Sequence, residues 1–127
     1  MEILRIPTWN FNIECPYRYD DLFFLTTDIN GTVKLSQTMA DECAHIAKSQ
    51  GHPSSTKPTQ LLTGGTDAAE FERIGIPATT LMGMPWGNTK HAKVYHTPND
   101  KVDAIEPKAV ATAIQIVIEF IKQKDSK

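Results

Sequence analysis

Two short segments carry the side chains best suited to catalysis or metal binding. In Gly64-Gly65-Thr66-Asp67, two glycines let the backbone turn sharply and bring an aspartate to the end of a strand, where α/β proteins place their sites. In Tyr95-His96-Thr97-Pro98-Asn99-Asp100, a loop histidine could ligate a metal or act as a base. Each also has an ordinary interpretation, since Asp67 could cap a helix and His96 could be a solvated loop residue.

Asp100 follows His96 by four residues. Its carboxylate could accept a hydrogen bond from the second ring nitrogen of the histidine and so fix the imidazole tautomer. It could equally cap residues 101–103. The sequence has no Gly-x-Ser-x-Gly element, which argues against a serine hydrolase built from His96 and Asp100.

Composition narrows the class of protein. The chain has 127 residues, 40% hydrophobic and 22% charged, which predicts one globular domain over residues 1–127. Its net charge of −2 is spread over 13 basic and 15 acidic residues, so we expect small molecules or peptides as partners, and neither nucleic acid nor membrane. No stretch is apolar enough to span a bilayer or serve as a signal peptide, which predicts a soluble protein, cytoplasmic if complete as given.

The two cysteines, Cys15 and Cys43, match neither a disulfide framework nor a CxxC metal motif. Cys43 lies on the apolar side of a helical pattern, so we expect a buried structural thiol. His45 lies beside the same apolar side and is interpreted as a packed or partly exposed helix residue.

Hydrophobic periodicity and turn residues divide the chain into strands and helices. We expect strands within residues 3–13, 21–30, 60–63 and 76–82, helices over 35–47, 68–74 and from Pro107 onward, and loops at 52–59 and 84–95. Gly51 and Gly75 are placed to end the first two helices. In the last helix, Val110, Ile114, Val117 and Ile121 form one apolar stripe. This order predicts an α/β fold, a three-layer α/β/α arrangement with a mixed, largely parallel sheet.

The order and spacing of three segments resemble a known family. The glycine-rich element ending in Asp67, the Gly75-Ile76-Pro77 strand start and the Tyr-His-Thr turn at His96 occur in the order typical of the zinc-dependent aminopeptidases, which include bacterial leucyl-type enzymes and are related to glutaminyl cyclases. The match covers roughly residues 64–121, and a looser similarity reaches back to residues 9–13. The chain therefore resembles the C-terminal half of that catalytic domain.

The resemblance implies roles for individual residues. It implies that His96 is a zinc ligand, that Asp67 lies in the surroundings of the same metal site, and that Thr97 and Asp100 support the histidine. Trp86 and His91 lie in the loop that borders the substrate pocket in the family, together with Tyr95, although packing under a long loop explains Trp86 about as well and Tyr95 better.

The chain also departs from the family. A complete site holds two zinc ions through two histidines and three carboxylates, with a glutamate as general base, and the His-x-Asp and Glu-Glu elements that supply several of these groups have no match here. A further carboxylate ligand ends a strand written Asn-Phe-Asp, where this chain offers Asn12, with Glu14 as an alternative. Asparagine is not a usual zinc ligand, so Asn12 is a doubtful metal position and we expect at most weak zinc binding by this chain alone.

Two functions follow as hypotheses. The first is the C-terminal part of a zinc aminopeptidase that removes N-terminal residues from peptides and is inactive in isolation. The second is a non-catalytic binding or assembly module that keeps the fold. Because half a sheet leaves an edge strand uncovered, the partners we expect are a peptide substrate and either the missing N-terminal half or a second copy.

Overall fold

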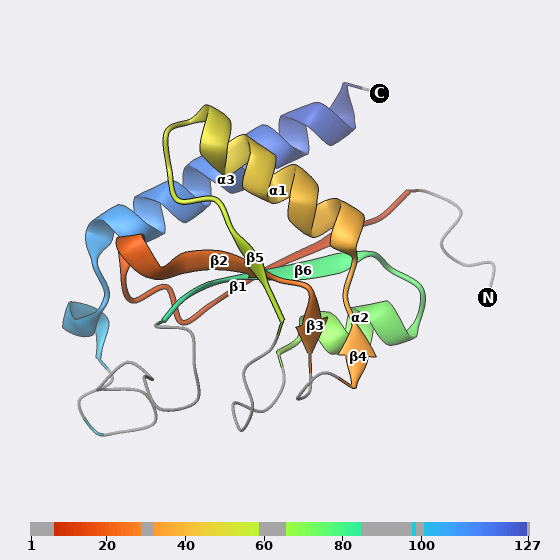
Figure 1. Cartoon of the computed structure of the whole chain (residues 1–127), viewed down its shortest axis with the longest axis horizontal. Helices are drawn as coiled ribbons and strands as arrows, with labels where there is room; N and C mark the ends of the chain where they lie inside the picture. The colour runs from red at the N-terminus through yellow and green to blue at the C-terminus, as the bar shows by residue number, and fades with distance from the viewer. Residues whose placement is uncertain (1–6, 29–31, 59–65, 85–97, 99–100, 127) are drawn as a thin grey trace.

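A computed structural model describes residues 7–28, 32–58, 66–84, 98 and 101–126, and its centre is a four-stranded sheet (Figure 1). The strands lie in the order β1 (Asn10–Glu14), β6 (Ala78–Gly83), β2 (Leu22–Leu25) and β5 (Thr56–Lys57). The β1–β6 and β2–β5 pairs are parallel, and the β2–β6 pair is antiparallel. A two-stranded antiparallel ribbon joins β3 (Thr27–Asp28) to β4 (Val33–Lys34).

Helices cover both faces of this sheet. The helices α1 (Gln37–Ser49) and α3 (Pro107–Asp125) lie together on one face, and the short helix α2 (Ala68–Arg73) lies on the other (Figure 1). Two 3-10 turns, η1 (Tyr19–Asp21) and η2 (Val102–Ala104), precede β2 and α3. The predicted three-layer α/β fold with a mixed sheet is confirmed.

The strand β2 shows why both faces need covering, since all four of its residues are buried. Leu22 and Phe24 point to the α1/α3 side, where they join a cluster containing Met39, Ile46, Ile116 and Phe120. Phe23 and Leu25 point to the opposite side, with Tyr17, Ala68 and Met84. Successive side chains alternate between the faces of a strand, so a continuous apolar run requires an apolar layer on each side.

Gly51, Gly75 and Pro107 lie at the helix ends where the sequence predicts them, and Ser36 forms a cap that the sequence analysis did not name. Ser36 precedes α1, and its hydroxyl accepts a hydrogen bond from the Met39 amide at 3.1 Å. Gly51 and Gly75 follow α1 and α2 with φ angles of 81° and 85°, in the left-handed region that favours glycine. Pro107 occupies the first turn of α3, where its missing N–H costs nothing.

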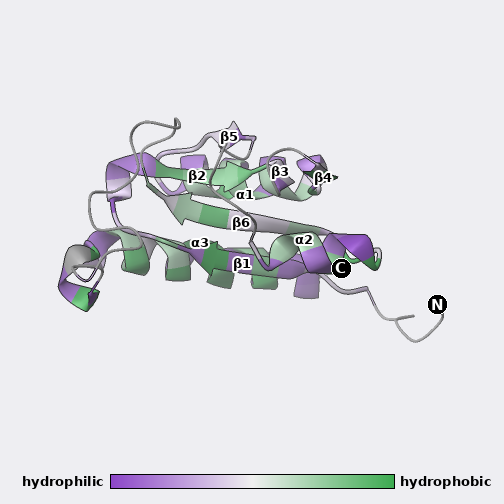
Figure 2. Ribbon diagram, turned by 90° about the horizontal axis from the view of Figure 1, so that it is seen from below, coloured by the Kyte–Doolittle hydropathy of each residue, from purple (hydrophilic) through white to green (hydrophobic). Residues whose placement is uncertain are grey.

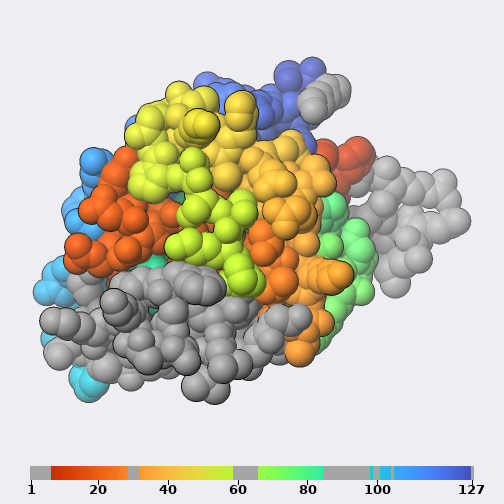
Figure 3. Space-filling model, viewed as in Figure 1, coloured from red at the N-terminus to blue at the C-terminus, as the bar shows by residue number. Residues whose placement is uncertain are grey.

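Two strands differ from the predicted pattern. The run expected over residues 21–30 breaks at Thr26, so that β2 ends and β3 begins the separate ribbon. Residues 52–59, expected to be only a loop, contain β5, because the backbone there completes the edge of β2 through bonds such as that from the Thr26 amide to the Lys57 carbonyl at 2.9 Å. Figure 3 shows this yellow-green segment lying against the orange surface of the β2 region. The predicted strand at 60–63 lies outside the described residues, as do residues 85–95 of the predicted loop.

The face of α3 that packs on the sheet is not its most apolar stripe. Its buried residues are Ala109, Thr112, Ala113, Ile116 and Phe120. The predicted stripe instead faces largely outward, with Ile114 51% and Ile121 58% exposed. Ala109 and Ala113 let α3 approach α1 and the sheet closely, Ile116 and Phe120 fill the core beside them, and the predicted stripe remains on the free flank. Within the described ranges, no helix has the length and apolarity to cross a membrane.

Candidate metal centre

Three acidic residues lie in the region of the carboxyl end of β1. Glu14 is the last residue of β1, Asp28 is the last residue of β3, and Asp67 immediately precedes α2. Burial raises the pKa of Glu14 most, and the charges of Asp67 and Asp28 raise it further. Three separate elements therefore bring acidic groups to one end of the sheet.

A tight turn holds Glu14 in place. The residue after it, Cys15, has a φ angle of 52°, and its carbonyl accepts hydrogen bonds from the Tyr17 amide at 2.9 Å and the Gly83 amide at 3.1 Å. Gly83 has no room for a side chain, because a Cβ there would lie 3.0 Å from the Arg18 carbonyl oxygen. The chain leaving β1 is thus fixed against the end of β6, and Glu14 is fixed with it.

The environment of Glu14 is unfavourable for a lone carboxylate. Burial raises its pKa most, the charges of Asp67 and then Asp28 raise it further, and a hydrogen bond with the Asn12 side chain lowers it. Its Oε2 atom is buried and has no hydrogen-bond partner among the described residues. A cation bound beside Oε2 would offset the repulsion among the carboxylates and would give this oxygen a partner.

Asp28 is engaged in a different way. Its side chain is fully buried and accepts hydrogen bonds from the backbone amide of Thr66, at 3.0 and 3.1 Å to its two oxygens, and from the Thr66 hydroxyl. The same hydroxyl lies 2.9 Å from the Thr80 hydroxyl on β6. Asp28 therefore ties the start of α2 to the sheet and helps to position Asp67, the residue after Thr66.

Asp67 occupies the N-cap position of α2 without acting as a side-chain cap. Its φ and ψ angles are −65° and −23°, and its carboxylate makes no capping hydrogen bond. Asp67 thus occupies the cap position that the sequence suggested, but its side chain does not make the capping hydrogen bond. The exposed carboxylate instead contributes negative charge at Glu14.

Asn12 points into the same region from the middle of β1. Its side-chain amide donates to the Thr80 hydroxyl at 3.3 Å, in register with the Asn12–Thr80 strand pair. A neutral amide used in this way links β1 to the Thr66–Thr80 hydroxyl pair. Of the two candidates on β1, Glu14 and not Asn12 has a carboxylate oxygen without a partner among the described residues. Glu14 is therefore the better candidate ligand.

The described residues fit a divalent cation only in part. Carboxylate oxygens of Asp and Glu can bind zinc, and Glu14 has one such oxygen without a partner among the described residues. Both oxygens of Asp28, in contrast, accept hydrogen bonds from Thr66. Nowhere in the described part of the chain do three histidine, cysteine, aspartate or glutamate residues form a group that could hold a metal. Among those residues, Glu14 is the one candidate ligand with an unsatisfied carboxylate oxygen.

The remaining predicted site residues lie outside the described residues. They are Trp86, His91, His96, Thr97 and Asp100, together with Tyr95. Of the other candidates, His45 is exposed on α1, as expected for a helix residue, and Cys43 is buried. Sequence reasoning missed Asp28, for which the available signal was an aspartate three residues after the buried apolar run of β2.

Fold and site together define an α/β/α protein with a carboxylate cluster at the end of its edge strand. The model of peptidase family M28 matches residues 10–121, and the chain belongs to this family. The match spans β1 through most of α3 and so includes every carboxylate of the candidate centre. No curated protein and no solved structure matched the chain. The family assignment supports a peptidase, and hence a hydrolase, function.

Proposed function

We propose that this chain supplies part of a zinc-dependent aminopeptidase centre, with Glu14 as the carboxylate ligand from β1 and Asp67 as a supporting charge. The observation that carries the proposal is the Glu14 Oε2 atom, which is buried, lacks a partner among the described residues and lies near two other acidic groups. Membership of peptidase family M28 supports the reaction class.

His96 remains the proposed histidine ligand on the basis of its Tyr-His-Thr turn. A bound zinc ion would polarise the scissile carbonyl and lower the pKa of a water molecule. The residues of this chain would then have separate tasks. Glu14 binds through its free oxygen, Asn12 holds the Glu14 side chain by a hydrogen bond, and the Asp28–Thr66 contact fixes the position of Asp67. Trp86 and His91 are proposed to border the substrate.

The chain is proposed to be inactive alone and at most a weak zinc binder. Glu14 is the only metal ligand that we propose among the described residues, which contain no group of three potential ligands. The sequence has no His-x-Asp or Glu-Glu element to supply the others and the general base. The complete centre would hold two zinc ions and would need a segment carrying those elements. Such a segment would be expected upstream in the same gene or in a neighbouring one.

Zinc content and aminopeptidase activity test this proposal directly. Purified chain, treated with chelator and then exposed to zinc and dialysed, should retain little metal and hydrolyse no aminoacyl substrate. Addition of a separately produced segment with the His-x-Asp and Glu-Glu elements should restore both. Tight stoichiometric zinc with turnover by the chain alone would contradict its incompleteness, and a stable complex without zinc or activity would favour the non-catalytic assembly module that Asn12 suggests.

A further inference from the structure

The outer edge of β1 presents backbone groups and apolar side chains that could pair with another strand. In the order β1-β6-β2-β5, β1 is at one end, and no described strand pairs with its free side. The Asn10 amide donates to the Pro77 carbonyl at 2.9 Å, towards β6. Because backbone groups alternate along a strand, Phe11 and Ile13 direct their N–H and C=O groups to the free edge.

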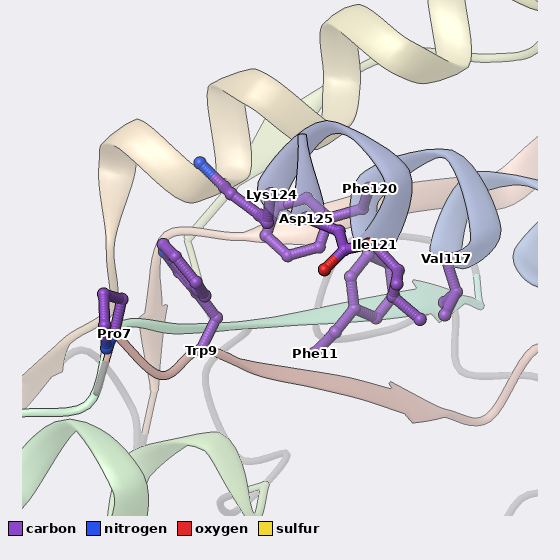
Figure 4. A pocket seen from close by; sticks show the side chains of 8 residues that line it. All are labelled: Pro7, Trp9, Phe11, Val117, Phe120, Ile121, Lys124 and Asp125. Carbon is purple, nitrogen blue, oxygen red and sulfur yellow. The ribbon is translucent and has the colours of Figure 1, made fainter. Parts of the chain in front are cut away.

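A largely apolar groove, whose lining also includes Lys124 and Asp125, runs beside this edge. It has a volume of about 800 Å³ and lies between the start of β1 and the last turns of α3 (Figure 4). Figure 4 shows Trp9 and Phe11 pointing from the strand towards α3, where Phe120, Val117 and Ile121 face them. Trp9 and Phe11 contact Phe120 with ring centroids 6.5 and 5.8 Å away. The groove is therefore a continuation of the core that opens at the sheet edge.

The outward stripe of α3 extends this surface. Val110, Ile114, Val117 and Ile121 recur at spacings of four, three and four, the pattern with which one helix packs against another. In Figure 2 the hydrophobic turns of α3 extend past the β1 edge of the sheet. Ile13, on the same strand face as Phe11, is 40% exposed. A contiguous apolar surface of this kind marks an interaction site.

We propose that this surface, the β1 edge with the α3 stripe, binds a second copy of the chain across a two-fold axis through Asn12. Antiparallel pairing of β1 with its own copy about Asn12 places Phe11 opposite Ile13 of the second copy. These are the two residues whose backbone groups face outward, so both positions become hydrogen-bonded pairs. The sheets join into one, and the two α3 stripes come together on the same face.

Side chains on the other face of β1 also match in this register. Asn10 comes opposite Glu14 of the second copy, and no two like charges oppose each other along the strand. Asn10 Oδ1 and Glu14 Oε2 are two of the buried oxygens without a partner among the described residues. The Asn10 amide of one copy can donate to Glu14 of the other. The pairing thus satisfies an acceptor that the single chain leaves open.

Analytical ultracentrifugation of the metal-free chain over a concentration series tests the association. We expect a reversible dimer, and Ile121→Lys should raise its dissociation constant by roughly tenfold or more, since it buries a charge in the stripe. Ile121→Leu, which keeps the apolar area, and Ile74→Lys, which adds the same charge to the 70% exposed residue after α2, should leave it within about threefold. A monomer at all concentrations, an open-ended polymer, or equal effects of the two lysine variants would overturn the proposal.

Cross-linking tests the register. Residue 12 of each copy meets its equivalent at the axis as a non-hydrogen-bonded pair, with Cα atoms about 4.5 Å apart, close enough for a disulfide. In a Cys15→Ser background, Asn12→Cys should give a disulfide-linked dimer under mild oxidation, whereas Ile74→Cys should not. A dimer that Asn12→Cys fails to cross-link would overturn the β1 pairing. Neither experiment depends on zinc or activity, so its outcome is separate from that of the proposed function.

Discussion

The carboxylate of Asp28 receives both the backbone amide and the hydroxyl of Thr66, and this contact joins the end of β3 to the start of α2. The two residues are 38 positions apart in the sequence. Through Thr66 the contact reaches Thr80 on β6, and through the next residue it sets the position of Asp67. A structural hydrogen bond thus determines where one of the charges around Glu14 is held.

Loss of this contact should destabilise the chain. We expect Asp28→Ala to cost about 1–3 kcal/mol in the free energy of unfolding, because the amide and hydroxyl of Thr66 lose a buried acceptor. Urea unfolding followed by circular dichroism measures the change. Thr66→Ser keeps both donors and should cost less than about 1 kcal/mol. If Asp28→Ala were as stable as the unmodified chain, the contact would have no structural role.

Glu14 should make the stability of the metal-free chain depend on pH. Its pKa is raised above the ordinary value of 4.5, so the folded chain binds this proton more tightly than the unfolded chain does. Stability from this group is fully present below pH 4.5 and falls as the pH rises through the higher folded value. We therefore expect Glu14→Gln to be more stable than the unmodified chain at neutral pH.

Thermal melts of the two proteins across a pH series measure this difference. The advantage of Glu14→Gln should shrink towards zero in acid, where Glu14 is protonated in both states. Asp103→Gln provides a matched control, since Asp103 is exposed in η2. If Glu14→Gln were destabilised by the same amount at acid and at neutral pH, the folded state would not disfavour the ionised form of Glu14.

The two thiols should differ in reactivity. Burial raises the pKa of Cys43 to about 12, with a further increase from Glu42 and an opposing effect of Lys124. Because the thiolate is the reactive form, Cys43 should not react with a thiol reagent at pH 8 until the chain unfolds, whereas half-buried Cys15 should react in the folded chain. Labelling followed by mass spectrometry distinguishes them. Rapid labelling of folded Cys15→Ser at Cys43 would contradict the packing of α1.

The features that the sequence predicts correctly depend on residues close together in the chain, and those that it does not predict depend on residues far apart. The apolar run around Phe24, the helix stop at Gly75 and the helix start at Pro107 are local signals, and each is confirmed. The packing direction of α3 is not local. The apolar stripe with Ile114 is visible in the sequence, but it faces outward, because the neighbouring face with Ala113 and Ile116 packs in the core.

The site shows the same division. Asp67 could be named as a candidate from the sequence, because the glycines that allow the sharp turn before it are its close neighbours. Asp28 was missed because its importance comes from Thr66, far along the chain. Asn12 and Glu14 are both polar residues on the same face of β1. Only the arrangement of neighbouring side chains shows that Asn12 is bonded to Thr80, while an oxygen of Glu14 lacks a partner among the described residues.

The proposed dimer and the proposed metal centre share Glu14 and the edge of β1. A copy paired at this edge would supply Asn10 to Glu14, whereas a segment completing the metal centre would leave Glu14 free to bind zinc. Self-association and completion of the site should therefore compete. Raising the chain concentration at a fixed amount of the completing segment should therefore raise the fraction of that segment in the active complex less steeply than one-to-one binding predicts.

The most direct test of the account is the zinc content of the completed complex with and without Glu14. The chain would be combined with a segment carrying the His-x-Asp and Glu-Glu elements, passed through a desalting column and analysed by mass spectrometry for bound metal. We predict that Glu14→Gln still binds the segment but retains less zinc and loses aminopeptidase activity, while Asn12→Ala loses less of both. Unchanged zinc and activity in Glu14→Gln would contradict the assignment of Glu14 as the ligand.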